Sequence, residues 1–270
     1  MNIKGYFKKR QNLIDKELDK LIPEARERPQ VIHRAMRYAL KGGKRVRPIL
    51  CLACAEAVGG NIKPAIKTSC AIEMIHTYSL VHDDLPSMDD DDYRRGRLTC
   101  HKKFGTANAI LTGDALLTLA FGVLSEATPD PKLNTRIVKE LSRAASTFGM
   151  IGGQAVDISE EEKDFVTMDY INIHKTGSLI AASCKAGAIA VNAKEKEIKS
   201  IFRFGEYIGL VFQIVDDILD RDGIAKIYEV KGAYQRAAEL TAKAKHCISY
   251  LGAKNKTLYA LADFMLNRSY

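Results

Sequence analysis

The distribution of proline is the feature that most restricts the fold of this chain. All seven prolines lie before residue 132, and the remaining 139 residues contain none. Helices can therefore run unbroken through that second half. Apolar residues recur at helical spacing in segments 49–53, 116–124 and 204–215, whereas strict period-two alternation is hard to find. The sequence predicts an all-α protein.

Glycine and proline mark the expected breaks between helices. They fall at Gly42-Gly43, Gly59-Gly60, Pro129 to Pro131, Gly152-Gly153 and Gly252. The lengths between these breaks suit a helical bundle better than a repeat solenoid. With 46% hydrophobic residues and no low-complexity linker, we expect residues 1–270 to form a single domain.

Charge and cysteine usage indicate the setting. Lys and Arg exceed Asp and Glu by 41 to 33, which suggests an anionic partner. Six scattered cysteines and the lack of an apolar leader after Met1 favour a cytoplasmic location. Asp114 and Lys185 interrupt the two most apolar stretches, so we expect no stable membrane association.

A first acidic segment places six aspartates within ten residues, directly before Arg94 and Arg95. Like charges this dense cost a helix about 0.2–0.5 kcal/mol for each close pair, so a purely structural role is poorly served. A solvated acidic turn is the alternative, and calcium loops look similar. The apolar Leu80-Val81 before Asp83 and Asp84 instead favours carboxylates at the end of a buried helix.

A second acidic segment, FQIVDDILD, carries Asp216, Asp217 and Asp220 in an apolar helical setting. Asp216 and Asp220 share a helix face, about 6 Å apart. Such oxygen ligands suit Mg²⁺, which usually shares its coordination with substrate phosphates, whereas zinc prefers His and Cys. The pattern indicates a phosphate-bearing substrate.

The spacing of the first segment predicts an interruption of its helix. Asp83 and Asp89 are six residues apart, which leaves them about 120° apart on a regular helix. Pro86 lies between them and disfavours helical continuation. A local loop or bulge there would bring Asp89 back beside Asp83.

The two acidic segments and their companions resemble the trans-type isoprenyl diphosphate synthases, the family that includes farnesyl and geranylgeranyl diphosphate synthases, and bacterial farnesyl diphosphate synthases most of all. The matching motifs are GGKRVRP (42–48), DDLPSMD (83–89) with Arg94-Arg95, GGQAVDI (152–158), Lys175-Thr176 and the segment from Gln213 to Asp220. The resemblance implies the isoprenoid synthase fold, an orthogonal bundle of helices around a central active-site cavity, and a homodimer.

The resemblance also implies an activity. It is the condensation of isopentenyl diphosphate with dimethylallyl or geranyl diphosphate, assisted by about three Mg²⁺ ions, with Mn²⁺ able to substitute. The expected product is farnesyl diphosphate; geranyl or geranylgeranyl diphosphate is an alternative, and so is a non-catalytic subunit of a heteromeric synthase. Two motifs argue against a terpene cyclase, and the acidic clusters argue against a nucleic-acid partner.

Roles for individual residues follow from the resemblance alone. The implied catalytic residues are Asp83, Asp84, Asp89, Lys175 and Asp216, and the implied metal ligands are Asp83, Asp89, Asp216 and Asp220. The implied isopentenyl diphosphate site consists of Lys44, Arg47, His76 and Arg95. The implied allylic diphosphate site consists of Arg94, Lys175, Thr176 and Gln213. Taken singly, each basic residue is more often a solvated surface charge.

Product length is expected to depend on the helix that ends at Asp83. Ser79 and Tyr78 lie four and five residues before Asp83, and Tyr78 has the bulk to form a floor for the growing tail. An aromatic residue at that position resembles the farnesyl-producing bacterial members.

The sequence departs from the family after Asp220, where a longer loop with a further lysine is usual. Lys226 resembles the start of the next helix rather than a replacement for that lysine. Either the loop is short or a segment is missing. Arg268 could close over a diphosphate, and the roles of His82 and His101 stay open.

Overall fold

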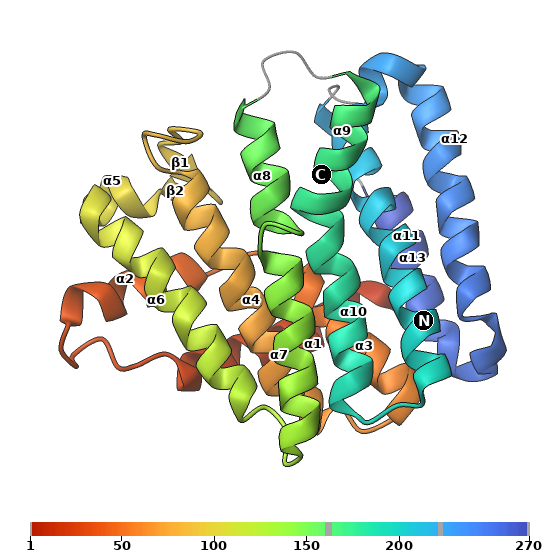
Figure 1. Cartoon of the computed structure of the whole chain (residues 1–270), viewed down its shortest axis with the longest axis horizontal. Coiled ribbons are helices and arrows are strands. Elements are labelled where there is room, and N and C mark those ends of the chain that lie inside the picture. The colour runs from red at the N-terminus through yellow and green to blue at the C-terminus, as the bar shows by residue number, and fades with distance from the viewer. Residues whose placement is uncertain (1, 160–163, 221–223, 269–270) are drawn as a thin grey trace.

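The computed structural model describes residues 2–159, 164–220 and 224–268, and these are almost entirely helical (Figure 1). The prediction of an all-α protein is confirmed. The helices, in chain order, are α1 (Ile3–Leu21), α2 (Gln30–Leu40), α3 (Val46–Gly59), α4 (Lys63–Asp83), α5 (Cys100–Phe104), α6 (Thr106–Ser125), α7 (Pro131–Ala145), α8 (Met150–Ser159), α9 (Phe165–Ile171), the π-helical turn η1 (Asn172–Gly177), α10 (Ser178–Ala190), α11 (Glu195–Asp220), α12 (Ile224–Cys247), the 3₁₀ segment η2 (Ser249–Asn255) and α13 (Lys256–Leu266).

Local sequence explains several helix ends. Asp130 caps α7 by accepting a hydrogen bond from the Lys132 amide, and Pro131 occupies the first turn, where its missing N–H costs nothing. No proline follows, and α10 and α11 run uninterrupted as expected.

One expected break is wrong. Gly152 and Gly153 lie inside α8, and the chain turns earlier, between α7 and α8. A Cβ on Gly153 would stand 2.2 Å from the backbone nitrogen of Lys175, so this glycine permits close packing of α8 on η1 rather than a turn.

The core forms where apolar helix faces meet. α10 packs against α3, α7 and α11, and α4 packs against α6. Phe204, Ile49 and Leu50 are among the largest side chains buried completely. In Figure 1 the carboxyl ends of α4 and α11, which carry the two acidic segments, lie on the same side of the molecule. That arrangement places the acidic residues at one end of the bundle.

A smaller apolar cluster lies beneath the first acidic segment. It joins Ala35, Val81, Leu85, Cys100 and Ala109 from α2, α4, the segment after α4, α5 and α6. Burial of these side chains anchors the acidic segment to the bundle.

α6 is the one helix among the described residues whose length and composition would allow it to cross a membrane. In its most apolar window, 39% of the residues are buried in the fold. We expected Asp114 to exclude this stretch as a membrane span, but the helix meets the length and composition criteria despite that residue. Core helices of soluble proteins pass the same test, and part of the exposed face of α6 is apolar, with Ile110 and Leu111 at 42% and 53% exposure.

Candidate active site

The first acidic segment folds back on itself, as its spacing predicts. α4 ends at Asp83, and the Asp89 amide then donates a hydrogen bond of 2.8 Å to the Asp83 carbonyl oxygen. The Asp90 amide donates to the Leu85 carbonyl oxygen at 3.1 Å. The non-helical turn around Pro86 therefore returns Asp89 to the end of α4.

The Asp83 carboxylate lies in an environment that favours a cation. Burial raises its pKa to about 6, the charge of Asp89 adds to the rise, and the charge of Lys175 opposes it. Two neighbouring carboxylates such as these are stabilised by a shared positive charge. Asp83 and Asp89 therefore have the electrostatics of a pair of metal ligands.

Asp84 has a different environment from Asp83. It is buried, and the Arg94 guanidinium bonds to it and also to Asp91, the latter at 2.9 Å. Burial raises the Asp84 pKa, and the bond to Arg94 counters this effect. The resemblance implies that Arg94 binds the allylic diphosphate. In this structure, two of its guanidinium nitrogens bond to carboxylates of the acidic segment itself.

A two-stranded hairpin connects the acidic segment to the GGKRVRP segment. β1 (Tyr93–Arg94) pairs antiparallel with β2 (Arg97–Leu98), and the turn between them carries Arg95. Arg95 Nη1 donates to the Gly42 carbonyl oxygen at 3.0 Å, and Nη2 lies 3.9 Å from Glu73 Oε1. The fold therefore brings Arg95 to the segment that contains Lys44 and Arg47.

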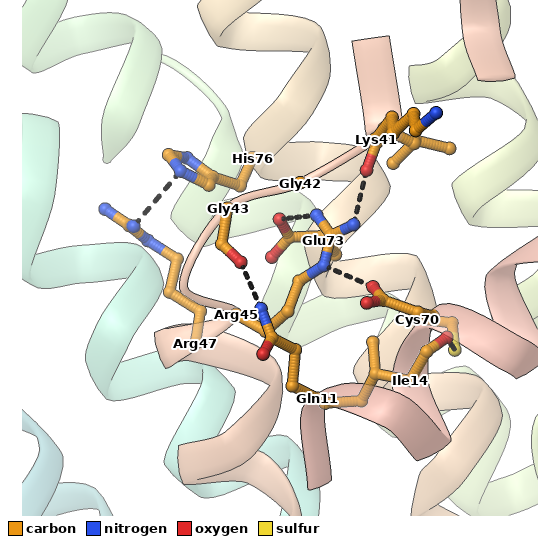
Figure 2. Close-up of polar contacts among 12 residues, drawn as sticks. Gln11, Ile14, Lys41, Gly42, Gly43, Arg45, Arg47, Cys70, Glu73 and His76 are labelled. Atoms are coloured by element: carbon orange, nitrogen blue, oxygen red, sulfur yellow. Dashed lines mark hydrogen bonds and ion pairs between the residues drawn. The ribbon is translucent and has the colours of Figure 1, made fainter. Parts of the chain in front are cut away.

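Arg47 and His76 are also brought together (Figure 2). Arg47 Nη1 lies 3.4 Å from His76 Nε2. Burial and the nearby charges of Arg47 and Arg95 hold the His76 pKa well below its usual value, so the ring is neutral and can accept from Arg47. Burial lowers the pKa of Arg47 to about 10, which leaves it charged at neutral pH. Lys44 lies on the exposed side of the same segment.

Arg45 and Glu73, which were not among the predicted site residues, form a buried ion pair of 2.6 Å. Arg45 also bonds to Asp15 at 2.8 Å and to the Leu40 carbonyl oxygen. Figure 2 shows the Arg45 side chain pointing to Glu73 and away from Arg47. Arg45 therefore holds the GGKRVRP segment in place. The sequence signal for this pair was Glu73, an acidic residue within the apolar stretch of α4, which needs a basic partner.

The second acidic segment lies on a regular helix, so Asp216 and Asp220 share a face of α11 as predicted. Asp217 is buried and accepts a hydrogen bond of 2.9 Å from Gln213 Nε2. Gln213 lines a separate cavity of about 390 Å³ beside α12, with Gly232 and Gln235. The structure thus directs Gln213 to Asp217 and to α12, apart from the cavity described next.

Seven of the predicted site residues line one cavity of about 490 Å³ between α3, α4, α8 and η1; they are Arg47, His76, Tyr78, Ser79, Asp83, Lys175 and Thr176. Met150, Ile151, Ala155 and Ile158 of α8 supply an apolar wall. A cavity lined by both charged and apolar side chains fits a molecule with an anionic head and a hydrocarbon tail.

Lys175 lines this cavity from η1. Its Nζ donates to Asp157 Oδ2 at 2.6 Å. Asp157 was not among the predicted site residues, although it belongs to the GGQAVDI motif. The ion pair orients Lys175 near Asp83, whose pKa it lowers.

Metal-binding chemistry rests on the aspartates. No group of three or more His, Cys, Asp or Glu side chains poised to hold an ion occurs in the part of the chain that the structure describes. Carboxylates at the ends of two helices suit Mg²⁺, which takes few protein ligands and completes its coordination with water and phosphate oxygens. Cys51 and Cys54 are buried, and burial raises their pKa values well above the usual range, so neither offers a thiolate to zinc.

Comparison with known proteins agrees with this geometry. The polyprenyl synthetase family model matches residues 29–247. The chain is 44% identical to geranylgeranyl pyrophosphate synthase 4 of Arabidopsis thaliana, over 100% of this chain and 79% of that protein. It is 40% identical to the farnesyl diphosphate synthase of Geobacillus stearothermophilus, over 96% of this chain and 89% of that protein.

Solved structures give the same result. The apo crystal structure of an FPP/GFPP synthase from Zymomonas mobilis superposes with a TM-score of 0.93 at 34% identity, covering 98% of this chain and 99% of that one. The alignment with the Arabidopsis protein spans 295 positions, more than the 270 residues of this chain, so that relative carries segments without a counterpart here. Residues 221–223, where a short loop or a missing segment was expected, lie outside the described residues. α12 begins at Ile224, as expected for a helix that contains Lys226 near its start.

Proposed function

We propose that this chain, which belongs to the polyprenyl synthetase family and is a trans-prenyltransferase, joins isopentenyl diphosphate to dimethylallyl and geranyl diphosphates and releases farnesyl diphosphate. The observation that carries the proposal is that one cavity is lined by the charged Asp83, Arg47 and Lys175 and also by the apolar residues of α8 and Tyr78. Such a cavity accepts a diphosphate head and a prenyl tail together.

The reaction breaks the bond between the allylic carbon and its diphosphate oxygen, and the bonding electrons leave with the diphosphate. The double bond of isopentenyl diphosphate then forms the new carbon–carbon bond, and loss of a proton to the departed diphosphate restores a double bond. Mg²⁺ would be held by Asp83, Asp89, Asp216 and Asp220. When bound, it would neutralise the negative charge that develops on the leaving diphosphate.

The protein's own residues bind, orient and exclude water. The isopentenyl diphosphate would be bound by Arg47, Lys44 and Arg95. A guanidinium group can donate two parallel hydrogen bonds to phosphate oxygens, and a lysine adds a positive charge. Neutral His76 orients Arg47, and Asp157 orients Lys175 toward the allylic diphosphate. The apolar wall of α8 keeps water from the cation that forms.

Product length has two candidates. Tyr78 lines the cavity five residues before Asp83 and is only 5% exposed, which supports a floor suited to a fifteen-carbon tail. The Arabidopsis relative is named a geranylgeranyl pyrophosphate synthase, which favours a twenty-carbon product instead. Chromatography of the products separates the two.

We also propose a homodimer in a reducing cytoplasm. Ile110 and Leu111 on α6 form an exposed apolar face that a second copy would bury, and the six cysteines are free thiols. Light scattering should give twice the chain mass. Monomers in the wild type would contradict this proposal.

The test of the proposed function is an assay of the purified single chain with isopentenyl and dimethylallyl diphosphates and Mg²⁺. Formation of a longer prenyl diphosphate that stops in EDTA supports it. Inactivity of the folded chain alone would indicate a non-catalytic subunit, and consumption of farnesyl diphosphate without isopentenyl diphosphate would indicate a cyclase.

A further inference from the structure

His82 lines the cavity and also contacts the neighbouring helix α6. It follows Tyr78 by four residues on α4, so the two side chains share a face. Their rings meet edge to face, with centroids 5.9 Å apart and planes at 82°. Both residues line the cavity beside Asp83. The imidazole therefore packs directly on the ring that would form the floor.

α6 fixes the other side of the His82 ring. Nε2 lies 3.0 Å from the Ile110 carbonyl oxygen, and since a carbonyl only accepts, Nε2 carries the proton. A Cβ built on Gly113 would stand 2.1 Å from Nε2. The residue at position 113 must therefore lack a side chain for the ring to occupy this place.

Nothing polar holds the Tyr78 ring itself. Its hydroxyl is buried without a hydrogen-bond partner among the described residues. The position of the ring is therefore set by packing, to which the main core cluster and the ring of His82 both contribute.

We propose that His82 is a positioning residue for product length: bound to α6 through Ile110 and Gly113, it holds the Tyr78 ring across the cavity. The inference rests on the proposed function, because it assumes that a prenyl tail grows toward Tyr78.

The experiment measures product length for variants of His82. His82→Ala removes the packing surface and should lengthen the product by one or more isoprene units although Tyr78 is intact. His82→Phe keeps a ring against Tyr78 but loses the hydrogen bond to Ile110, and it should lengthen the product less than His82→Ala does. A wild-type distribution in His82→Ala would overturn the proposal.

A second pair of variants leaves His82 itself unchanged. Gly113→Ala pushes on Nε2 and should change the product distribution, whereas Gly122→Ala, on the same helix with nothing within 4 Å of an added Cβ, should not. Thermal melts of each variant separate unfolding from a change in length. Equal distributions in both glycine variants would contradict the role of α6.

The two failures are distinguishable. If the wild-type chain elongates no diphosphate, the proposed function fails. If it does, and Tyr78→Ala lengthens the product while His82→Ala and Gly113→Ala do not, only the role of His82 fails.

Discussion

Arg268 Nη2 lies 2.6 Å from Asp216 Oδ1, so a cation near the end of the chain covers a carboxylate of the second acidic segment. The same guanidinium donates to the Phe212 carbonyl oxygen at 2.6 Å and lies 3.8 Å from the centroid of the Phe212 ring. The side chains of Arg268 and Asp216 are 10% and 25% exposed, so solvent screens their attraction only partly. In this arrangement Arg268 engages Oδ1 of Asp216, an oxygen that could otherwise bind a metal.

Arg268→Gln is predicted to strengthen metal binding in the substrate-free protein. A metal ion must displace Arg268 from Asp216, and removing this competition should lower the Mn²⁺ dissociation constant several-fold, corresponding to about 1 kcal/mol. Electron paramagnetic resonance of free Mn²⁺ measures the change. Arg136→Gln, which breaks an exposed pair with Glu195, is the control. Weaker or unchanged Mn²⁺ binding in Arg268→Gln would contradict the competition.

Asp83→Ala and Asp216→Ala should each reduce turnover at least a hundredfold while the circular dichroism spectrum is unchanged. The loss of a metal ligand acts mainly on the transition state, where negative charge on the leaving diphosphate is greatest. Asp92→Ala is the matched control, because Asp92 belongs to the same acidic run but pairs with Lys102 on the surface. Turnover in EDTA equal to turnover in Mg²⁺ would refute the metal role.

Arg47→Ala should raise KM for isopentenyl diphosphate tenfold or more and change KM for the allylic substrate little. Charge-assisted hydrogen bonds contribute about 1.5–3 kcal/mol, which corresponds to that range. Lys44→Ala should act in the same direction. Arg10→Ala removes an equally buried arginine whose partner is Glu56, and it should reduce stability without separating the two KM values. Equal effects of Arg47→Ala on both substrates would merge the two anion sites.

Tyr78→Ala should shift the product to twenty carbons or more, because it empties a ring-sized volume at the end of the cavity. Tyr78→Phe should keep the wild-type length, since the bulk of the ring and not its unpartnered hydroxyl would stop the tail. Product chromatography reads both results. The phenylalanine variant should be at least as stable as the wild type, because it removes a buried unsatisfied group.

His76 should make the unfolding free energy depend on pH. Its pKa is well below 6.5 in the folded protein, so below pH 6.5 only the unfolded chain takes up this proton, and stability falls as pH falls. Relative to His76→Gln, the wild type should lose stability between pH 7 and 5, with a limiting slope of about 1.4 kcal/mol per unit. Urea unfolding at several pH values measures the difference, and parallel curves would refute a neutral buried His76.

Most of the helices and the chemistry of the acidic segments could be predicted from the sequence. Helical spacing of apolar residues and the absence of proline after residue 131 are local properties, and local properties fix secondary structure. The return of Asp89 to Asp83 could also be predicted. A six-residue spacing would put the two residues on different faces of a regular helix, and Pro86 disfavours such a helix. That Asp216 and Asp220 share a face of α11 follows from helix periodicity alone.

Which charges pair with each other depends on the packing of helices that are distant in sequence. The GGKRVRP segment offers three basic residues, and sequence does not show that Arg45 is consumed by Glu73 while Arg47 turns to His76. The same holds for Gln213, which bonds Asp217 and lines a cavity beside α12. Periodicity gives the face of each helix on which a side chain lies, but the partner depends on which helices, distant in sequence, pack against that face.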